Sequence, residues 1–114
     1  MDHLTEMLKG VLEGCMLEIL SRQRAYGYEI TRELHRMGLQ EVVEGTVYAI
    51  LLRFEKNGWV QVEKHPSSLG PPRKVYALNA QGETARQAFW KRWDFLTQTI
   101  SQWRMENKNE ELFS

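Results

Sequence analysis

The chain has 114 residues and a mass of 13.4 kDa, the size of one small domain. Hydrophobic residues make up 42% and charged residues 26%, a balance that excludes wholesale disorder and collagen-like repeats. The 15 basic and 15 acidic residues cancel, with ten of each sign in residues 1–78 and five of each in residues 79–114. No segment therefore has the strongly basic character that by itself indicates a nucleic-acid-binding domain.

Three features of the sequence lead us to expect a cytoplasmic protein with no membrane partner. The longest apolar run, residues 47–52, is far shorter than the ~18 residues of a membrane-spanning helix. The first residues lack the basic segment and cleavage site of a secretory signal. Cys15 is the only cysteine, which excludes an internal disulfide and favours a reducing compartment.

Apolar residues at helical spacing predict two helices in the first third of the chain. The first is expected over residues 4–21. Gly10 and Gly14 lie within it, either where another element approaches closely or at positions that the helix merely tolerates. The second helix is expected over about residues 27–37, with Gly38 as its C-terminal stop.

A third helix is expected to open at residues 44–46, where Gly45 or Thr46 can cap it, and to end at Gly58. Its predicted core stripe consists of Val47, Ile50, Leu51 and Phe54. Thr46, Ala49 and Arg53 then lie on an outward strip, with Tyr48 and Leu52 beside it near the boundary.

The pattern then changes to alternation, which predicts strands at residues 59–64 and 74–78. The turn residues 65–73 between them include all three prolines, so an antiparallel hairpin with a stiff projecting loop is expected. Asn79 can cap a long last helix that runs to about residue 105, and the polar tail 106–114 is expected to fray.

The predicted fold is mainly α with a small β-hairpin, in the order of a winged helix-turn-helix followed by a long helix. We expect one compact unit overall, with a DNA-binding part at residues 1–78, a dimerisation helix at 79–105 and a tail at 106–114.

Catalytic and metal-binding functions find no support in the sequence. His3, His35 and His65 are far apart, and none has a second ligand at metal-binding spacing. Cys15 falls on the apolar stripe of the first helix, which favours a packed thiol over a nucleophile. No phosphate-binding loop or nucleophile elbow is present. We therefore expect a protein that is not an enzyme and has no metal or cofactor.

DNA binding has a physical basis in the third helix and the wing. An α-helix fits the major groove, and the outward strip offers Thr46, Tyr48, Ala49 and Arg53. Arg73 and Lys74 follow the stiff loop and suit phosphate contact. The start of the second helix, at Tyr28, can offer backbone amides to a phosphate. The alternatives are a half-buried Tyr48 and a basic wing pair that is simply solvated.

Four blocks of sequence together resemble the PadR family of bacterial transcriptional regulators. They are residues 26–30 (YGYEI), 44–48 (EGTVY), 53–58 (RFEKNG) and 70–76 (GPPRKVY). The resemblance extends from about residue 8 to residue 103, and the single last helix is similar to the family's smaller subfamily. It implies a homodimeric winged-helix repressor of a symmetric DNA operator, with Thr46, Tyr48, Ala49, Arg53, Arg73 and Lys74 as DNA contacts.

Two positions depart from the family's usual pattern. Leu52 stands where relatives often have a basic or polar residue, and Ala49 where many have proline. The resemblance therefore does not give the DNA sequence that this chain prefers.

The aromatic residues of the last helix predict a partner, because its apolar face is wider than one small domain can cover. The first helix is the expected surface for a second subunit's last helix. In multidrug-sensing members of the family, a tryptophan of the last helix stacks flat ligands, and Trp93 resembles it. The resemblance implies that a planar aromatic ligand binds at Phe89, Trp90, Trp93, Leu96 and Thr97 and relieves repression. The alternative is that Trp93 only packs in the core of the dimer.

Two other classes of function stay open at this point. A winged helix can be a protein–protein interaction module, and zero net charge favours that alternative. The chain can also be a hydrophobic ligand-binding protein without operator specificity.

Overall fold

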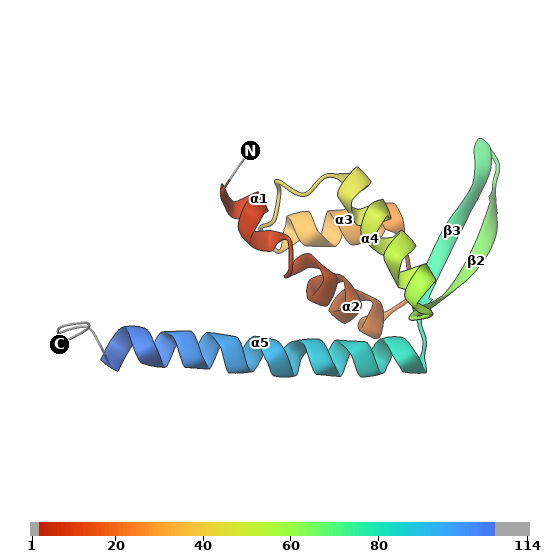
Figure 1. Cartoon of the computed structure of the whole chain (residues 1–114). Helices are drawn as coiled ribbons and strands as arrows, with labels where there is room; N and C mark the ends of the chain where they lie inside the picture. The colour runs from red at the N-terminus through yellow and green to blue at the C-terminus, as the bar shows by residue number, and fades with distance from the viewer. Residues whose placement is uncertain (1–2, 107–114) are drawn as a thin grey trace.

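The computed structural model describes residues 3–106. Four short helices and a small antiparallel sheet form a body that lies on one long helix (Figure 1). The predicted mainly α fold with a hairpin is therefore confirmed. In chain order the elements are α1 (His3–Leu8), α2 (Leu12–Arg22), β1 (Ala25–Tyr26), α3 (Gly27–Arg36), α4 (Glu44–Asn57), β2 (Val60–Ser67), β3 (Gly70–Leu78) and α5 (Ala80–Glu106).

The prediction of one continuous helix over residues 4–21 is wrong. α1 ends at Leu8, and the Val11 N–H donates to the Leu8 carbonyl at 2.9 Å in a turn before α2 begins. Gly10 lies in this turn, and a Cβ there would meet no atom within 4 Å, so no other element of the described chain approaches it closely. The apolar stripe survives the break because Leu8 and Leu12, on either side of it, are both buried.

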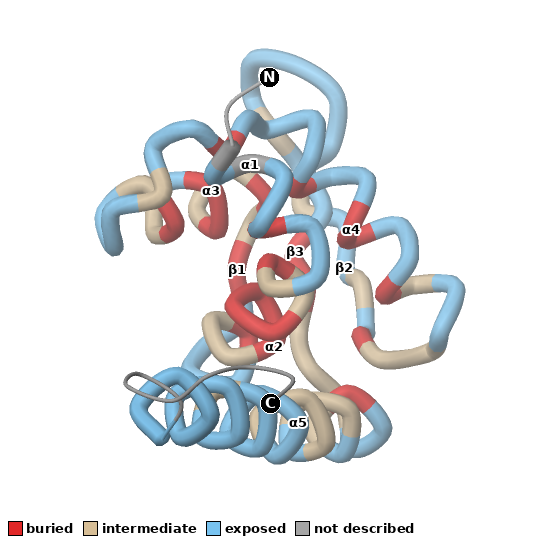
Figure 2. The backbone as a smooth tube through the Cα atoms, turned by 60° about the vertical axis from the view of Figure 1, so that its left-hand side comes forward, coloured by how far each residue is buried: buried red, intermediate tan, exposed pale blue. Residues whose placement is uncertain are grey.

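The core lies between α2, α3 and α4, and Figure 2 shows that α2 is buried along most of its length. The third helix buries its predicted stripe of Val47, Ile50, Leu51 and Phe54. This burial fixes the opposite side of α4 toward solvent. The largest fully buried side chains are those of Phe54, Met16, Leu17, Ile30, Leu34, Leu51 and Val47.

The ends of α3 and α4 are set by two glycines with positive φ. Gly38 has φ +114° after α3, and Gly58 has φ +74° after α4, as the C-terminal stops predict. The N-terminal prediction for α4 is wrong: the cap is Val43, which has extended backbone and no side-chain bond. Gly45 and Thr46 lie inside the first turn because the helix already begins at Glu44.

The sheet has three antiparallel strands in the order β1-β3-β2. β1 was not predicted, because two residues are too few to show alternation. The long loop at residues 65–73 is also wrong: pairing continues from Val60↔Leu78 to Ser67↔Gly70. The hairpin tolerates its prolines for two reasons. Pro66 falls at a register irregularity of β2, and Pro71 and Pro72 lie in the part of β3 before Val75, which has only β2 as a neighbouring strand.

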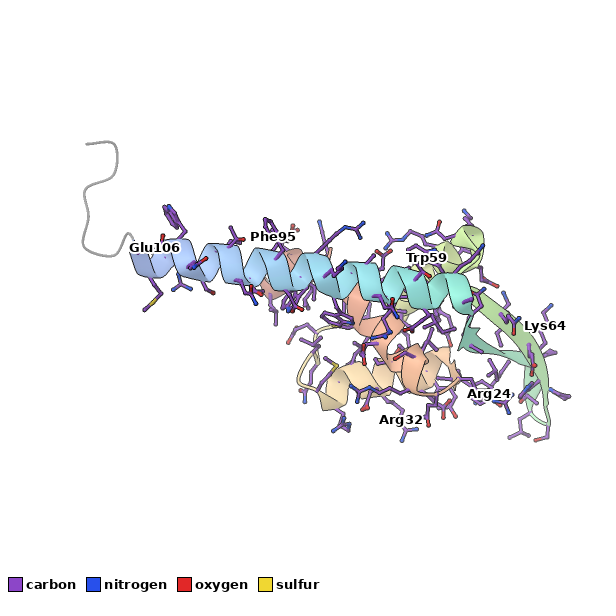
Figure 3. The ribbon with its side chains drawn as sticks, turned by 90° about the horizontal axis from the view of Figure 1, so that it is seen from below. Arg24, Arg32, Trp59, Lys64, Phe95 and Glu106 are labelled. Carbon is purple, nitrogen blue, oxygen red and sulfur yellow. The ribbon has the colours of Figure 1, made fainter. Side chains whose placement is uncertain are left out.

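α5 is capped by Asn79, as predicted. The Asn79 side-chain oxygen accepts from the Gly82 N–H at 2.9 Å, and its amide nitrogen donates to the Gly58 carbonyl at 2.8 Å. Only Gly82 is buried among the α5 residues, and the half of the helix beyond Phe95 extends past the rest of the fold (Figure 3). Within residues 3–106, no helix is long and apolar enough to cross a membrane. The expected tail lies outside the described residues, apart from Glu106, with which α5 ends.

Candidate nucleic-acid interface

A groove of 930 Å³ separates the exposed side of α4 from the hairpin of β2 and β3. We call it the wing groove. Its walls come from the start of α3, from one flank of α4 and from the outer part of the hairpin. The lining residues are Tyr26, Gly27, Tyr28, Glu44, Tyr48, Leu52, Glu55, Ser67, Leu69, Gly70, Pro71, Pro72, Arg73, Lys74 and Tyr76.

Tyr48 is held in place at the surface by a glycine. A Cβ at Gly27 would lie 2.4 Å from Tyr48 Cε1, so only glycine allows the ring to pack on the start of α3. The Tyr48 side chain nevertheless remains 45% exposed. This geometry fixes the ring on the protein and leaves the residue accessible from the wing groove.

A stack of side chains ties the hairpin to the start of α3. The Tyr26 and Tyr28 rings are stacked with centroids 5.7 Å apart, and Arg73 Cζ lies 5.3 Å from the Tyr28 centroid. On the other side, the Tyr26 hydroxyl lies 3.3 Å from His65 Nδ1. The guanidinium of Arg73 is therefore positioned by a cation–π contact, which leaves its N–H groups available to an anion.

The backbone amides at the start of α3 are partly occupied. The Tyr26 N–H donates to Glu29 Oε1 at 2.9 Å. A carboxylate already lies at this helix terminus, where a phosphate would have to bind. Tyr28 therefore contributes to the wing groove mainly through its ring.

The other two candidate cations are paired with carboxylates. Lys74 Nζ lies 3.5 Å from Glu55 Oε1, and Arg53 Nη2 lies 3.5 Å from Glu13 Oε1 on α2. Both pairs are partly exposed, so water screens them and a DNA phosphate can compete for the cations. With Glu44 and Glu55 facing Arg73 and Lys74, the wing groove is electrically balanced.

Tyr76 forms part of the floor of the groove. Burial, assisted by the charge of Glu55 and by Tyr48, raises its pKa to about 12. Its hydroxyl therefore stays protonated near neutral pH and adds no charge to the groove.

Four of the seven predicted DNA-contact residues come together in the wing groove: Tyr28, Tyr48, Arg73 and Lys74. Thr46, Ala49 and Arg53 are exposed on α4 but lie outside the groove lining.

The sequence reasoning missed Tyr26, Glu44 and Glu55. Glu44 and Glu55 are about three helical turns apart and share a helix flank with Tyr48, so helical spacing held a signal for them. The sequence held no signal for the packing of Tyr26 on Tyr28, because Tyr26 belongs to the short strand β1, which the sequence did not predict.

Comparison with known proteins assigns the chain to a family of transcriptional regulators. The sequence profile of the transcriptional regulator PadR-like family matches residues 16–88. The chain belongs to the PadR-like family. It is 40% identical to a Streptococcus transcriptional regulator of known structure, with a TM-score of 0.76 over 86% of this chain and 96% of that one.

Two further PadR-like structures agree with this assignment. A regulator from Bacillus cereus is 39% identical, with a TM-score of 0.74 over 85% of this chain and 94% of its own. A transcription factor from Bacteroides fragilis is 34% identical, with a TM-score of 0.73 over 89% and 98%. This PadR-like chain is thus a DNA-binding transcriptional regulator of winged-helix fold, in a family of regulators and not of enzymes.

A second hollow lies in this PadR-like protein where α5 passes the turn between α1 and α2. It has a volume of 430 Å³. Four of the five predicted ligand residues line it, namely Phe89, Trp93, Leu96 and Thr97, together with Gly10, Val11, Ile100 and Ser101.

Trp90, the fifth predicted ligand residue, points elsewhere. Its indole N–H donates to Glu18 Oε1 at 3.0 Å, and Arg86 Nη1 donates to the same oxygen at 2.9 Å. Burial opposes ionisation of Glu18, but the bonds from Arg86 and Arg22 outweigh it and lower the pKa of that carboxyl. This network joins α5 to α2.

Phe89 seats α5 on α2 at a single glycine. A Cβ at Gly14 would lie 2.0 Å from Phe89 Cε1, so close approach at Gly14 is confirmed. Cys15, the next residue, is buried, and burial raises the pKa of its thiol.

Proposed function

We propose that this protein is a homodimeric repressor that acts in the cytoplasm on a DNA operator with two-fold symmetry. The observation that carries the proposal is the wing groove, where the exposed flank of α4 and the cations Arg73 and Lys74 face the same space. A recognition helix beside a basic wing suits simultaneous contact with base edges and phosphates. The DNA contacts of the proposal are Tyr28, Thr46, Tyr48, Ala49, Arg53, Arg73 and Lys74.

The proposal divides the work of the chain between two parts. Residues 1–78 bind DNA, and the helix at residues 79–105 joins two subunits. Support for the second role comes from the exposed apolar side chains of α5, among them Leu96 and Ile100, which are 53% and 54% exposed. Met7 of α1 is also exposed and suits contact with the last helix of a second subunit.

The proposed regulation places a planar aromatic ligand on α5 between the two subunits. The hollow beside Phe89, Trp93, Leu96 and Thr97 supports this role, because flat apolar ligands stack on such side chains. The ligand relieves repression if it binds better to the arrangement of subunits that does not fit the operator. Trp90 can join the other proposed ligand-binding residues only if its indole N–H gives up the hydrogen bond to Glu18.

The test is a binding titration of the purified full chain at physiological salt. We expect it to prefer DNA from upstream of its own gene over random duplex of equal length. Arg53→Ala should weaken specific binding by about 1–3 kcal/mol. Equal affinity for both duplexes would contradict the proposal.

The wing contact is tested by salt dependence. Lys74→Gln should weaken all duplexes alike and reduce the slope of log K against log salt by about one unit for each protomer. Arg32→Gln removes an equal charge from α3 at a position outside the wing groove, and serves as the control. The proposed phosphate contact is wrong if the two variants behave identically.

A protein–protein interaction module remains a second candidate, and the balanced charge of the wing groove favours it. In that case binding in the groove would change little with salt, since no counterions would be released. The salt series therefore separates the two candidates.

A further inference from the structure

Between its charged ends, the exposed side of α4 has no side chain that can identify a base by paired hydrogen bonds. From Gly45 to Leu52 the helix has no acidic, basic or amide side chain. Its only polar side chains in that stretch are the hydroxyls of Thr46 and Tyr48. Arg53, the next residue, is exposed and lies 3.5 Å from Glu13 on α2, so it is the charged member of the proposed DNA contacts on this helix.

Leu52 is the most prominent apolar residue on this side. Its side chain is 51% exposed, whereas the adjacent Leu51 is fully buried. Ala49, one turn earlier, is exposed, and a Cβ at Gly45 would meet no atom within 4 Å. These three residues form a low apolar strip that runs along α4, with Leu52 at its edge toward the wing groove.

The strip is not explained by the fold. The core contacts of α4 come from its buried stripe on the opposite side, so Leu52 is not needed to hold the helix (Figure 2). The charges that line the wing groove balance, but the guanidinium of Arg73 lies over the Tyr28 ring and keeps its N–H groups available to an anion, which suits DNA as the occupant of this face.

The chemistry of the major groove narrows what such a strip can recognise. Arginine or lysine identifies guanine and asparagine or glutamine identifies adenine, each through paired hydrogen bonds. An apolar side chain finds one complementary group there, the C5-methyl group of thymine. Small residues such as Ala49 and Gly45 let the helix approach the base edges closely enough for this contact.

We propose that Leu52, supported by Ala49, is a specificity-determining residue that reads thymine methyl groups, so that each operator half-site carries thymine under the middle of α4. This inference rests on the proposed DNA-binding function. It names the part of the base that the recognition helix reads. It also predicts that the hydroxyls of Thr46 and Tyr48 add to a readout based mainly on methyl contacts.

The experiment uses the full chain and a duplex recovered by selection from a randomised pool. Each thymine in the duplex is replaced in turn by deoxyuridine, which lacks only the C5-methyl group. We expect one or two positions in each half-site at which affinity falls about three- to fivefold, the effect of uncovering one methyl group. Leu52→Ala removes the contact from both half-sites, so it should lower affinity for the thymine duplex by about 10- to 25-fold and show no further loss with deoxyuridine.

The matched control is Leu69→Ala, which truncates another exposed leucine that lines the same groove but belongs to the wing. It should keep the full deoxyuridine effect. Thermal unfolding should show that both variants fold, since both side chains are exposed.

Three results would overturn the inference. Equal affinity for thymine and deoxyuridine at every position would exclude methyl readout. A deoxyuridine effect that persists in Leu52→Ala would assign the methyl contact to another side chain. A pool that yields no enriched duplex would overturn the proposed function itself, so the two failures are distinguishable.

Discussion

At the scale of single residues, Gly10 and Gly14 demonstrate that identical residues four positions apart have different roles. A Cβ at Gly14 would overlap Phe89 of α5, whereas a Cβ at Gly10 would meet open space. Helical periodicity placed both on one helix and gave both the same pair of explanations. The turn between α1 and α2 contains Gly10 alone, and the path of α5 over α2 brings Phe89, more than 70 positions away, onto Gly14.

We therefore expect opposite effects of alanine at the two glycines. Gly14→Ala should destabilise the fold by about 1–3 kcal/mol, because Phe89 must move from a close-packed site. Gly10→Ala should be neutral or stabilise by up to about 1 kcal/mol, since it restricts the unfolded chain. Urea unfolding of both variants checks this. Adding Phe89→Leu to Gly14→Ala should recover part of the loss, and no recovery would contradict the assigned contact.

In the candidate site, the sequence predicted those residues whose exposure depends on a single helix or strand. The exposed positions of α4 followed from its buried stripe, so Thr46, Tyr48, Ala49 and Arg53 were placed correctly on its outer side. The ion pairs of Arg53 with Glu13 and of Lys74 with Glu55 were not predictable. These pairs join α4 to α2 and to β3, and the pattern of residues along the sequence does not give the relative positions of these elements.

At the scale of elements, the junction between the hairpin and α5 depends on one side chain. Asn79 accepts from Gly82 and donates to the carbonyl of Gly58 at the end of α4. It thus joins the start of α5 to the end of α4, the proposed recognition helix.

A graded pair of variants separates these two bonds. Asn79→Ala removes both and should cost about 1–2 kcal/mol of unfolding free energy. Asn79→Asp keeps an oxygen that accepts from Gly82 but loses the donor to Gly58, so its stability should be intermediate. Chemical denaturation of the three proteins measures the order. A stability of Asn79→Asp equal to that of Asn79→Ala would contradict a capping role.

The first turn of α5 should also respond to acid. Hydrogen bonds from Arg86 and Gln87 lower the pKa of Glu83 from 4.5 to about 2. A carboxyl with a lower pKa in the folded state stabilises the fold fully above its unfolded pKa, and this contribution is lost as pH falls toward 2. Thermal unfolding from pH 7 to pH 2 should show a steeper decline for the wild type than for Glu83→Gln. Melting temperatures that fall equally with pH in both proteins would contradict a stabilising role for ionised Glu83.

The elements themselves were predicted best where periodicity is long. α3, α4 and α5 followed from their apolar stripes, and the glycine stops after α3 and α4 were correct. The break between α1 and α2 leaves the stripe intact, so periodicity does not reveal it. The wing is longer than predicted because prolines occupy a bulge and an unpaired edge, where the missing N–H costs little.

At the scale of the whole molecule, the single chain is far from spherical. Its extents are 67 × 32 × 21 Å, and its Cα radius of gyration is 17.7 Å, against about 13 Å for a compact chain of this length. The excess comes from two projections on opposite sides of the body, the distal part of α5 and the hairpin of β2 and β3 (Figure 1). An isolated protomer therefore leaves a row of apolar side chains in water, and association would remove them from it.

A single charge on that row should separate the subunits. Ile100→Glu places a carboxylate on the apolar side of α5, where dimer formation would bury it without a partner. We expect sedimentation velocity at micromolar concentration to give a monomer for this variant and a dimer for the wild type. Operator affinity should fall by about 10²-fold or more, because two linked half-site contacts become one.

Gln98→Glu is the matched control, since it adds the same charge on the opposite side of the helix, away from the row that contains Leu96 and Ile100. It should remain dimeric and keep its operator affinity. A wild-type protein that sediments as a monomer, or a dimer that survives Ile100→Glu, would show that α5 does not join the subunits. The spacing of two recognition helices would then have to be set by another surface of the chain.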